Sequence, residues 1–213
     1  MLHQDFLFSY QNRDMAFWLV SHCDTVVNRE GYVGKLQEYI PVDIYGRCGI
    51  EECSRHADDC FAEMSERHLF YIAFENSICD EYLTEKFYRT LNYPVIPIVM
   101  GGADYNKLAP PHSFIDINDF ESVEALSKYL TRLSRNPKEY SAYFKWKETH
   151  DVYTFRPFCQ LCEKLHQVQP GRVDKIVENG YDWWYKRPNG EATCSDGSER
   201  KYFKDIKDFK HVS

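Results

Sequence analysis

The stretch FYIAFENSICDEYLTEKFYRTL, Phe70–Leu91, predicts a buried strand, a short polar loop and an amphipathic helix. The apolar run at its start is typical of a parallel strand that is covered on both faces. In the helix, Leu83, Phe87 and Leu91 form an apolar stripe. Asp80 is the expected N-cap of this helix. Because ligands of open α/β sheets bind beyond the carboxyl ends of strands, the polar loop is the expected place for a nucleotide.

Strands and helices alternate along the rest of the chain, which favours an α/β fold with a mainly parallel sheet. The other expected strands are Met15–Val20, Val42–Tyr45, Pro94–Met100 and Phe114–Ile117. The expected helices are Arg29–Ile40, a short one within Asp59–Glu66, Val123–Ser134 behind an N-cap at Ser122, and one from Pro137 through Trp146.

The chain divides into three predicted parts. Residues 1–14 are a leading segment, residues 15–167 form a Rossmann-like domain, and residues 168–213 form a C-terminal tail. We expect the aromatic cluster Tyr181–Tyr185 to anchor the tail on the domain surface, and the charged residues from Glu199 onward to be frayed.

Composition excludes several classes of protein. The 213 residues carry a net charge of −7 without a basic stripe, so nucleic acid is not an expected partner. The most apolar window, Leu91–Ala103, is too short to span a bilayer, and the first residues do not resemble a signal peptide. Eight cysteines nevertheless indicate an oxidising lumen, so we expect the chain to be a piece of a longer lumenal protein.

The cysteines predict disulfides without fixing their partners. Cys159 and Cys162 form a CxxC pair, for which we favour a structural disulfide over half a zinc site or a redox centre. The connectivity of the other six is left open by the sequence: Cys23, Cys48, Cys53, Cys60, Cys79 and Cys194.

The predicted helix carries a polar face. Tyr82, Glu85, Lys86 and Arg89 fall at i, i+3, i+4 and i+7. Cationic side chains bind phosphate, and carboxylates bind hydroxyl groups, so this face suits a sugar nucleotide. The alternative is an ordinary surface ion pair between Glu85 and Arg89.

The motifs FENS and YLTEK in this stretch resemble the donor-binding signature of the α1,3-fucosyltransferases. The segments 16–49 and 94–130, the motif YSAYFKWK and the FCQLC pair resemble that family in the same order, over roughly residues 15–165. VDIYGRCG, GGADY and APPHSF are most similar to the core type, which modifies the innermost N-acetylglucosamine of N-glycans. The resemblance implies the C-terminal half of a GT-B enzyme with two Rossmann-like domains.

The resemblance also implies an activity and its partners. The expected reaction is inverting transfer of fucose from GDP-fucose in α1,3 linkage to a glycoprotein N-glycan in the Golgi lumen. The acceptor-side domain and the membrane anchor of a type II protein are expected elsewhere in the longer protein. No Asp-x-Asp motif occurs, so we expect neither a metal nor another cofactor. The alternatives are a Lewis-type enzyme, a module that binds GDP-fucose without transfer, and a cysteine-rich protein-interaction domain.

The expected catalytic residues are Glu85 and Lys86. Lys86 and Arg29 would neutralise the leaving diphosphate, and Arg29 matches the family's phosphate-binding arginine. Glu85 would accept hydrogen bonds from fucose hydroxyls. Asn76 would bind the ribose or hold the loop, and Tyr82 would pack on guanine or ribose or bind a phosphate.

Three further expectations concern carboxylates and histidines. Glu75 is a weaker candidate, as a support for Arg29 or the ribose. A general base is not identified, because the family takes it from the acceptor-side domain. The possible proton-transfer groups in this chain are Asp43, Asp104, His22 and His112.

Overall fold

The structure is a computed structural model that describes residues 10, 12–49, 58–152, 157–167, 179–187 and 189–206. The chain forms two compact units, one of residues 1–150 with 194–213 and one of residues 151–193. The end of the chain, from residue 194, groups with the first unit, and the predicted division after residue 167 stays a prediction.

The first unit is built on a five-stranded sheet in the order β2-β1-β3-β5-β6, in which all described pairs are parallel. The strands are β1 (Asp14–Leu19), β2 (Val42–Tyr45), β3 (His68–Phe74), β5 (Ile96–Met100) and β6 (Ile115–Asp116). All seven residues of the central strand β3 are buried, as its apolar run predicts. The predicted α/β fold with a mainly parallel sheet is confirmed.

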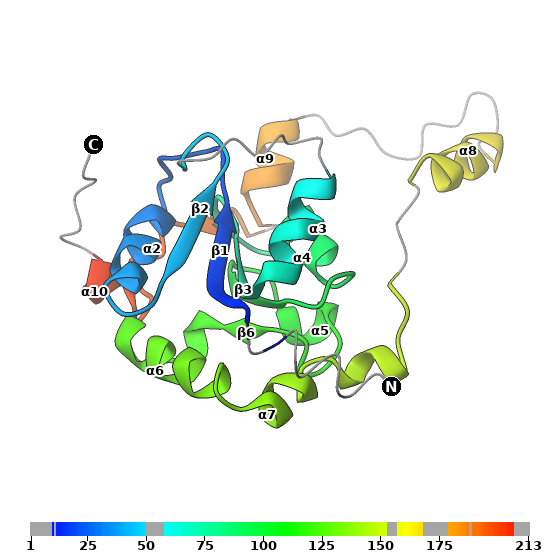
Figure 1. Ribbon diagram of the computed structural model, residues 1–213. Coiled ribbons are helices and arrows are strands. Elements are labelled where there is room, and N and C mark those ends of the chain that lie inside the picture. The colour runs from blue at the N-terminus through cyan, green and yellow to red at the C-terminus, as the bar shows by residue number, and fades with distance from the viewer. Residues whose placement is uncertain are drawn as a thin grey trace. The chain divides into compact units, whose positions relative to one another are not determined.

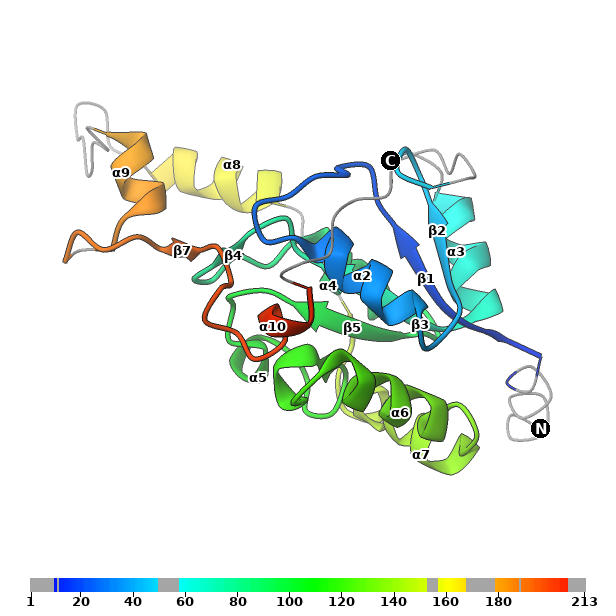
Figure 2. The same ribbon diagram turned by 90° about the vertical axis from the view of Figure 1, so that its left-hand side faces the viewer.

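Helices cover both faces of the sheet, so the unit has three layers (Figure 1). On one side lies α2 (Arg29–Gln37), and α6 (Val123–Leu133) and α10 (Phe203–Ile206) lie beside it (Figure 2). On the other side lie α3 (Asp58–Arg67) and α4 (Glu85–Thr90) (Figure 1). The remaining helices in the described residues of this unit are α5 (Tyr105–Leu108) and α7 (Pro137–Ala142), with 3₁₀ turns at Ile117–Asp119 and Lys145–Glu148.

Two helix starts follow the predicted capping. The Ser122 side chain accepts a hydrogen bond from the Ala125 amide at the start of α6. Asn136 caps α7, and Pro137 occupies its first turn.

The helix predicted within Phe70–Leu91 starts later than the sequence predicts. Asp80 does not cap it, because α4 begins only at Glu85. The intervening residues follow another path: β4 (Ile78–Cys79) pairs with β7 (Cys194–Ser195), and Glu81 adopts a left-handed φ of 55°, which a helix cannot contain. Tyr82 therefore precedes the helix and does not share a helical face with Glu85.

The expectation of a frayed end from residue 199 is wrong for residues 199–206, while residues 207–213 lie outside the described part. Tyr202 and Ile206 are fully buried, and Tyr202 packs edge-on against Tyr32 of α2. The Asp205 carboxylate accepts a hydrogen bond from the Val123 amide at 2.9 Å, which caps α6 from a distant segment. This segment is thus part of the core around α2.

Two disulfides are defined within the first unit, Cys23–Cys48 and Cys79–Cys194. Cys60 is disulfide-bonded as well. The Cys23–Cys48 bond joins the loops that follow β1 and β2. The Cys79–Cys194 bond closes a separation of 115 residues and joins β4 to β7.

The second unit contains α8 (Pro157–Gln167) and α9 (Gly180–Tyr185). The predicted disulfide is not formed, since Cys159 and Cys162 are exposed free thiols on α8. On α9 the cluster Tyr181–Tyr185 has exposed aromatic side chains, and its predicted anchoring role stays a prediction. Neither these helices nor any other described one is long and apolar enough to cross a membrane.

Candidate functional site

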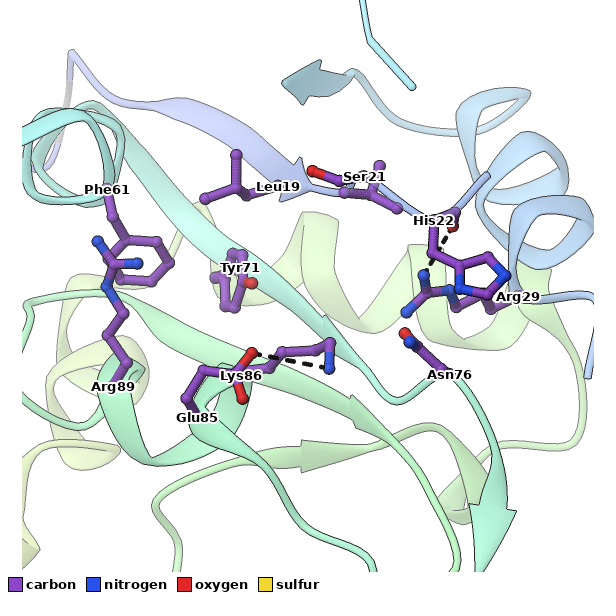
Figure 3. A pocket seen from close by; sticks show the side chains of 11 residues that line it. Leu19, Ser21, His22, Arg29, Phe61, Tyr71, Asn76, Glu85, Lys86 and Arg89 are labelled. Atoms are coloured by element: carbon purple, nitrogen blue, oxygen red, sulfur yellow. Dashed lines mark hydrogen bonds and ion pairs between the residues drawn. The ribbon is translucent and has the colours of Figure 1, made fainter. Parts of the chain in front are cut away.

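A cavity of about 360 Å³ opens at the carboxyl ends of β1 and β3, where the sequence predicts a nucleotide site (Figure 3). The loop after β1, the start of α2, the body of α3, strand β3 and helix α4 all contribute to its wall. The lining residues are Leu19, Val20, Ser21, His22, Arg29, Phe61, Tyr71, Asn76, Glu85, Lys86 and Arg89. Of the five predicted binding residues, Arg29, Asn76, Glu85 and Lys86 meet here, whereas Tyr82 is not among the lining residues.

Arg29 is buried at the start of α2, with an exposed fraction of 2%. Its Nη1 donates to the carbonyl of Phe74 and its Nη2 to the carbonyl of His22, both at 2.8 Å. Burial lowers the pKa of Arg29, and the neighbouring carboxylate of Glu30 opposes that shift. A guanidinium carries five N–H groups, two of them on each Nη atom, so each Nη atom has one N–H beyond these two bonds.

The turn before α2 fixes the direction of Arg29. Asn28 is the N-cap in the left-handed conformation, and its side chain accepts a hydrogen bond from the Gly31 amide at 3.1 Å. A Cβ atom at position 31 would lie 2.6 Å from Asn28 Oδ1, so a side chain there would displace the capping side chain of Asn28. The C-terminal segment supports the same turn, because Asn28 Nδ2 donates to the carbonyl of Ile206.

Lys86 is held by a carboxylate that the sequence did not assign to it. Its Nζ lies 3.0 Å from Oε2 of Glu75 and 3.0 Å from the hydroxyl of Thr84. Glu75 also accepts a hydrogen bond from the Thr84 amide at 2.8 Å, which satisfies a free N–H at the start of α4. Glu75 thus supports Lys86 through hydrogen bonds. The sequence predicts that it supports Arg29, but its hydrogen bonds go to Thr84 and Lys86 instead.

The opposite end of the cavity is aromatic. Figure 3 shows Arg29, His22 and Asn76 at one end, Phe61 and Arg89 at the other, and Tyr71 between them. The Arg89 guanidinium lies 4.2 Å from the centre of the Phe61 ring. Burial raises the pKa of the Tyr71 phenol, so this group is a neutral hydrogen-bonding partner.

Sequence reasoning missed Phe61 and Tyr71 as lining residues. Tyr71 carries a hydroxyl inside an otherwise apolar strand, and this was the available signal. Phe61 gave none, because its position in α3 is set by an aromatic cluster with Phe17 and Tyr71. Glu85 is largely exposed at the cavity rim, with its Oε1 4.0 Å from Lys86 Nζ.

The four candidate proton-transfer groups are scattered. His22 lines the cavity. Asp43 instead lies 2.9 Å from the ring of the buried His68, and Asp104 pairs with Lys107 at 2.8 Å on the surface. His112 stacks on Tyr143 with ring centres 4.0 Å apart, and burial lowers its pKa.

One group of described side chains has the chemistry of a cation site. Asp14, Asp43 and His68 place one potential ligand atom each within 4.8 Å of the others. None of the three lines the cavity, where the only carboxylate among the lining residues is Glu85. The residues of the cavity therefore do not offer the paired carboxylates that commonly hold Mg²⁺.

Comparisons with known proteins point to one family. The model of "Glycosyltransferase family 10 (fucosyltransferase) C-term" matches residues 10–183. Alpha-(1,3)-fucosyltransferase C of Drosophila melanogaster is 42% identical over 170 residues, which cover 80% of this chain and 40% of the relative. Glycoprotein 3-alpha-L-fucosyltransferase A of the same organism is 40% identical over 203 residues, covering 93% of this chain and 40% of the relative.

Solved structures show the same fold. A crystal structure of an α1,3-fucosyltransferase with GDP-fucose superposes with a TM-score of 0.57 at 18% identity, over 80% of this chain and 51% of that one. A second, with GDP, gives a TM-score of 0.52 at 21% identity, over 64% of this chain and 39% of that one. The chain spans about 40% of the length of the two fruit-fly relatives.

Proposed function

Because the chain belongs to glycosyltransferase family 10, we propose that it is the donor-binding part of an inverting α1,3-fucosyltransferase that uses GDP-fucose. Its relatives are named as α1,3-fucosyltransferases, and a structure of the same fold was solved with GDP-fucose. The cavity at the ends of β1 and β3 is then the donor site.

The observation that carries this proposal is the approach of two cations to one cavity from different elements. Arg29 reaches it from the start of α2, and Lys86 from the first turn of α4. Both are held by hydrogen bonds to the end of β3. In a chain with a net charge of −7, such a local concentration of positive charge favours a diphosphate.

The chemistry of transfer needs such charges. When fucose leaves GDP, the bond between the anomeric carbon and the β-phosphate oxygen breaks, and negative charge grows on the diphosphate. Preorganised cations stabilise that charge without reorganisation. Arg29 and Lys86 supply the stabilising positive charge, and Glu85 at the rim accepts hydrogen bonds from sugar hydroxyls. Asn76 and Tyr82 are assigned to the nucleoside side, with Tyr82 resting on the motif alone.

The same arrangement supports transfer without a metal ion. Metal-dependent sites usually carry paired carboxylates, and the cavity offers Glu85 alone. The cations take the place of the metal charge. Activity should then persist when divalent ions are removed with a chelator.

The acceptor and the compartment are further parts of the proposal. The acceptor is the N-acetylglucosamine of a glycoprotein N-glycan, of the core type, and the enzyme works in the Golgi lumen as part of a type II membrane protein. The disulfides Cys23–Cys48 and Cys79–Cys194 suit an oxidising compartment. The general base is assigned to an acceptor-side domain of the longer protein.

The test is transfer of labelled fucose from GDP-fucose to an N-glycan glycopeptide by a full-length protein that contains this chain, with Lys86→Ala as the comparison. Expected is transfer by the parent in the presence of a chelator, with a strong loss in the variant. Transfer from another nucleotide sugar in preference to GDP-fucose would refute the donor assignment. Binding of GDP-fucose without transfer to any acceptor would favour the alternative of a binding module.

A further inference from the structure

We propose that Glu75 is a positioning residue for the donor site, which sets the ammonium group of Lys86 at the cavity. This inference rests on the proposed function, whereas the contacts between Glu75 and Lys86 do not depend on it. Glu75 does not line the cavity, so it acts through Lys86 and not on the ligand.

Glu75 and Lys86 form a largely buried charged pair. The Glu75 side chain has no exposed surface, and that of Lys86 is 19% exposed. A buried carboxylate without partners is strongly destabilising, and Glu75 has several. Its two oxygens accept hydrogen bonds from the amide of Thr84, the hydroxyl of Thr84 and Nζ of Lys86, at 2.8–3.0 Å.

Two of the three N–H groups of the Lys86 ammonium are bonded within the protein. One donates to Glu75 and one to the Thr84 hydroxyl, both at 3.0 Å. The third remains for a ligand, since Glu85 lies at 4.0 Å, beyond hydrogen-bond length. A lysine on its flexible four-carbon stem normally loses much side-chain freedom on binding a phosphate. Here Glu75 and Thr84 impose that loss before the ligand arrives.

Two consecutive residues, Phe74 and Glu75, hold the two cations. The carbonyl of Phe74, the last residue of β3, accepts from Arg29, and the side chain of Glu75 accepts from Lys86. The Glu75 amide donates to the Met100 carbonyl at the end of β5, which fixes this point to the sheet. The end of β3 therefore sets the separation between the two groups that grip the diphosphate.

Close packing keeps the Glu75 side chain in place. A Cβ atom at Gly101 would lie 3.5 Å from Cγ of Glu75 and 2.5 Å from the hydroxyl of Tyr105. A side chain at position 101 would clash with the Tyr105 hydroxyl, whereas its contact with the stem of Glu75 would be an ordinary one. The residue after β5 thus lies against the stem of Glu75, whose side chain has no exposed surface.

Capping of α4 through the Thr84 amide is the alternative role, and a double-mutant cycle separates the two. The cycle uses Glu75→Gln and Lys86→Ala, alone and combined, in the oxidised full chain, with GDP and guanosine as calorimetric ligands. Positioning predicts that Glu75→Gln weakens GDP binding about tenfold, the size expected for a charge-assisted hydrogen bond. Guanosine binding should change less than about twofold, and the effect on GDP should vanish in the Lys86→Ala background.

Two variants keep the cycle interpretable. Thr84→Val removes the hydroxyl that accepts from Lys86 but keeps the backbone amide bonded to Glu75, so it should weaken GDP binding in the same way even if Glu75→Gln does not fold. Glu124→Gln breaks an exposed pair with Lys128 and should leave GDP binding unchanged. If Glu75→Gln weakens the binding of GDP and guanosine equally, its role is purely structural. The same holds if it weakens GDP binding equally with and without Lys86.

A second measurement does not depend on nucleotide binding. The acetylation rate of each lysine can be followed by mass spectrometry in the absence of ligand. Glu75→Gln should raise the rate at Lys86 severalfold and leave that at Lys128 unchanged. If the wild-type chain does not bind GDP, the proposed function fails, and this rate still decides whether Glu75 holds Lys86. An unchanged rate at Lys86 would overturn the inference.

Discussion

The Nη1 atom of Arg29 lies 2.8 Å from the carbonyl oxygen of Phe74, so the first residue of α2 is tied to the last residue of β3. A second bond of the same length, from Nη2 to the carbonyl of His22, ties it to the loop after β1. The guanidinium thus closes the gap between the carboxyl ends of two adjacent strands and lines the cavity between them. It has a structural role and a ligand-facing role together.

Arg29→Lys is expected to weaken both stability and GDP binding. A lysine keeps the charge but cannot reach both carbonyls with a planar fork. Leaving a buried carbonyl without its donor should reduce the free energy of unfolding by about 1–3 kcal/mol. Denaturant unfolding and GDP titration measure the two effects. Arg132→Lys is the matched control, since its exposed pair with Glu139 contributes little. A fully stable Arg29→Lys variant would contradict the structural role.

Lys86→Ala is expected to weaken GDP binding by about 10- to 100-fold, the range for a hydrogen bond to a charged group. Guanosine, which lacks phosphates, should bind almost as before. Lys128→Ala is the control, because that lysine forms an exposed pair with Glu124. A similar loss for GDP and guanosine would place Lys86 away from the diphosphate.

Stability should also depend on the protonation of Asp116. Burial raises the pKa of this carboxyl above its ordinary value of 3.8, against the opposing hydrogen bonds from Asn118. The folded state therefore binds a proton more tightly than the unfolded chain does. The resulting stabilisation is fully present below pH 3.8 and is lost as the pH rises through the folded-state pKa.

Asp116→Asn tests this dependence, because a neutral amide can still accept from the Asn118 amide. The melting temperature of the variant, relative to the wild type, should increase as the pH rises from about 3 to about 6. A difference that stays constant over this interval would show that Asp116 does not titrate as its burial requires.

The Cys79–Cys194 bond should be a major source of stability. It closes a separation of 115 residues, and loss of such a native disulfide is expected to reduce the free energy of unfolding by about 2–5 kcal/mol. The double variant Cys79→Ser/Cys194→Ser measures this in denaturant. Cys159→Ser/Cys162→Ser is the matched control, because both are exposed free thiols. A loss of stability in this second double variant would indicate that Cys159 and Cys162 form the predicted disulfide.

The sheet and most of the site were predictable because they depend on local patterns. The apolar run of β3 and the polar residues after it placed Asn76, Glu85 and Lys86 at one strand end. The start of α4 was not predictable in the same way. It depends on the Glu75 carboxylate reaching the Thr84 amide, a contact that forms only when the loop folds back.

The C-terminal segment shows a second limit of sequence reasoning. Tyr202 and Ile206 stand among charged residues, so their local pattern indicates a solvated tail. Both are buried against the α2 side of the first unit, and the Cys79–Cys194 bond brings the segment there. Disulfide partners cannot be read from the order of cysteines, because several pairings satisfy the same sequence.

Calorimetric titration of the oxidised 213-residue chain with GDP and GDP-fucose, with and without a chelator, tests the central claim most directly. The account predicts saturable binding of both ligands that the chelator does not change and that Lys86→Ala weakens. A folded chain that binds neither ligand, or that binds them only with a divalent ion, would contradict a donor site built on Arg29 and Lys86.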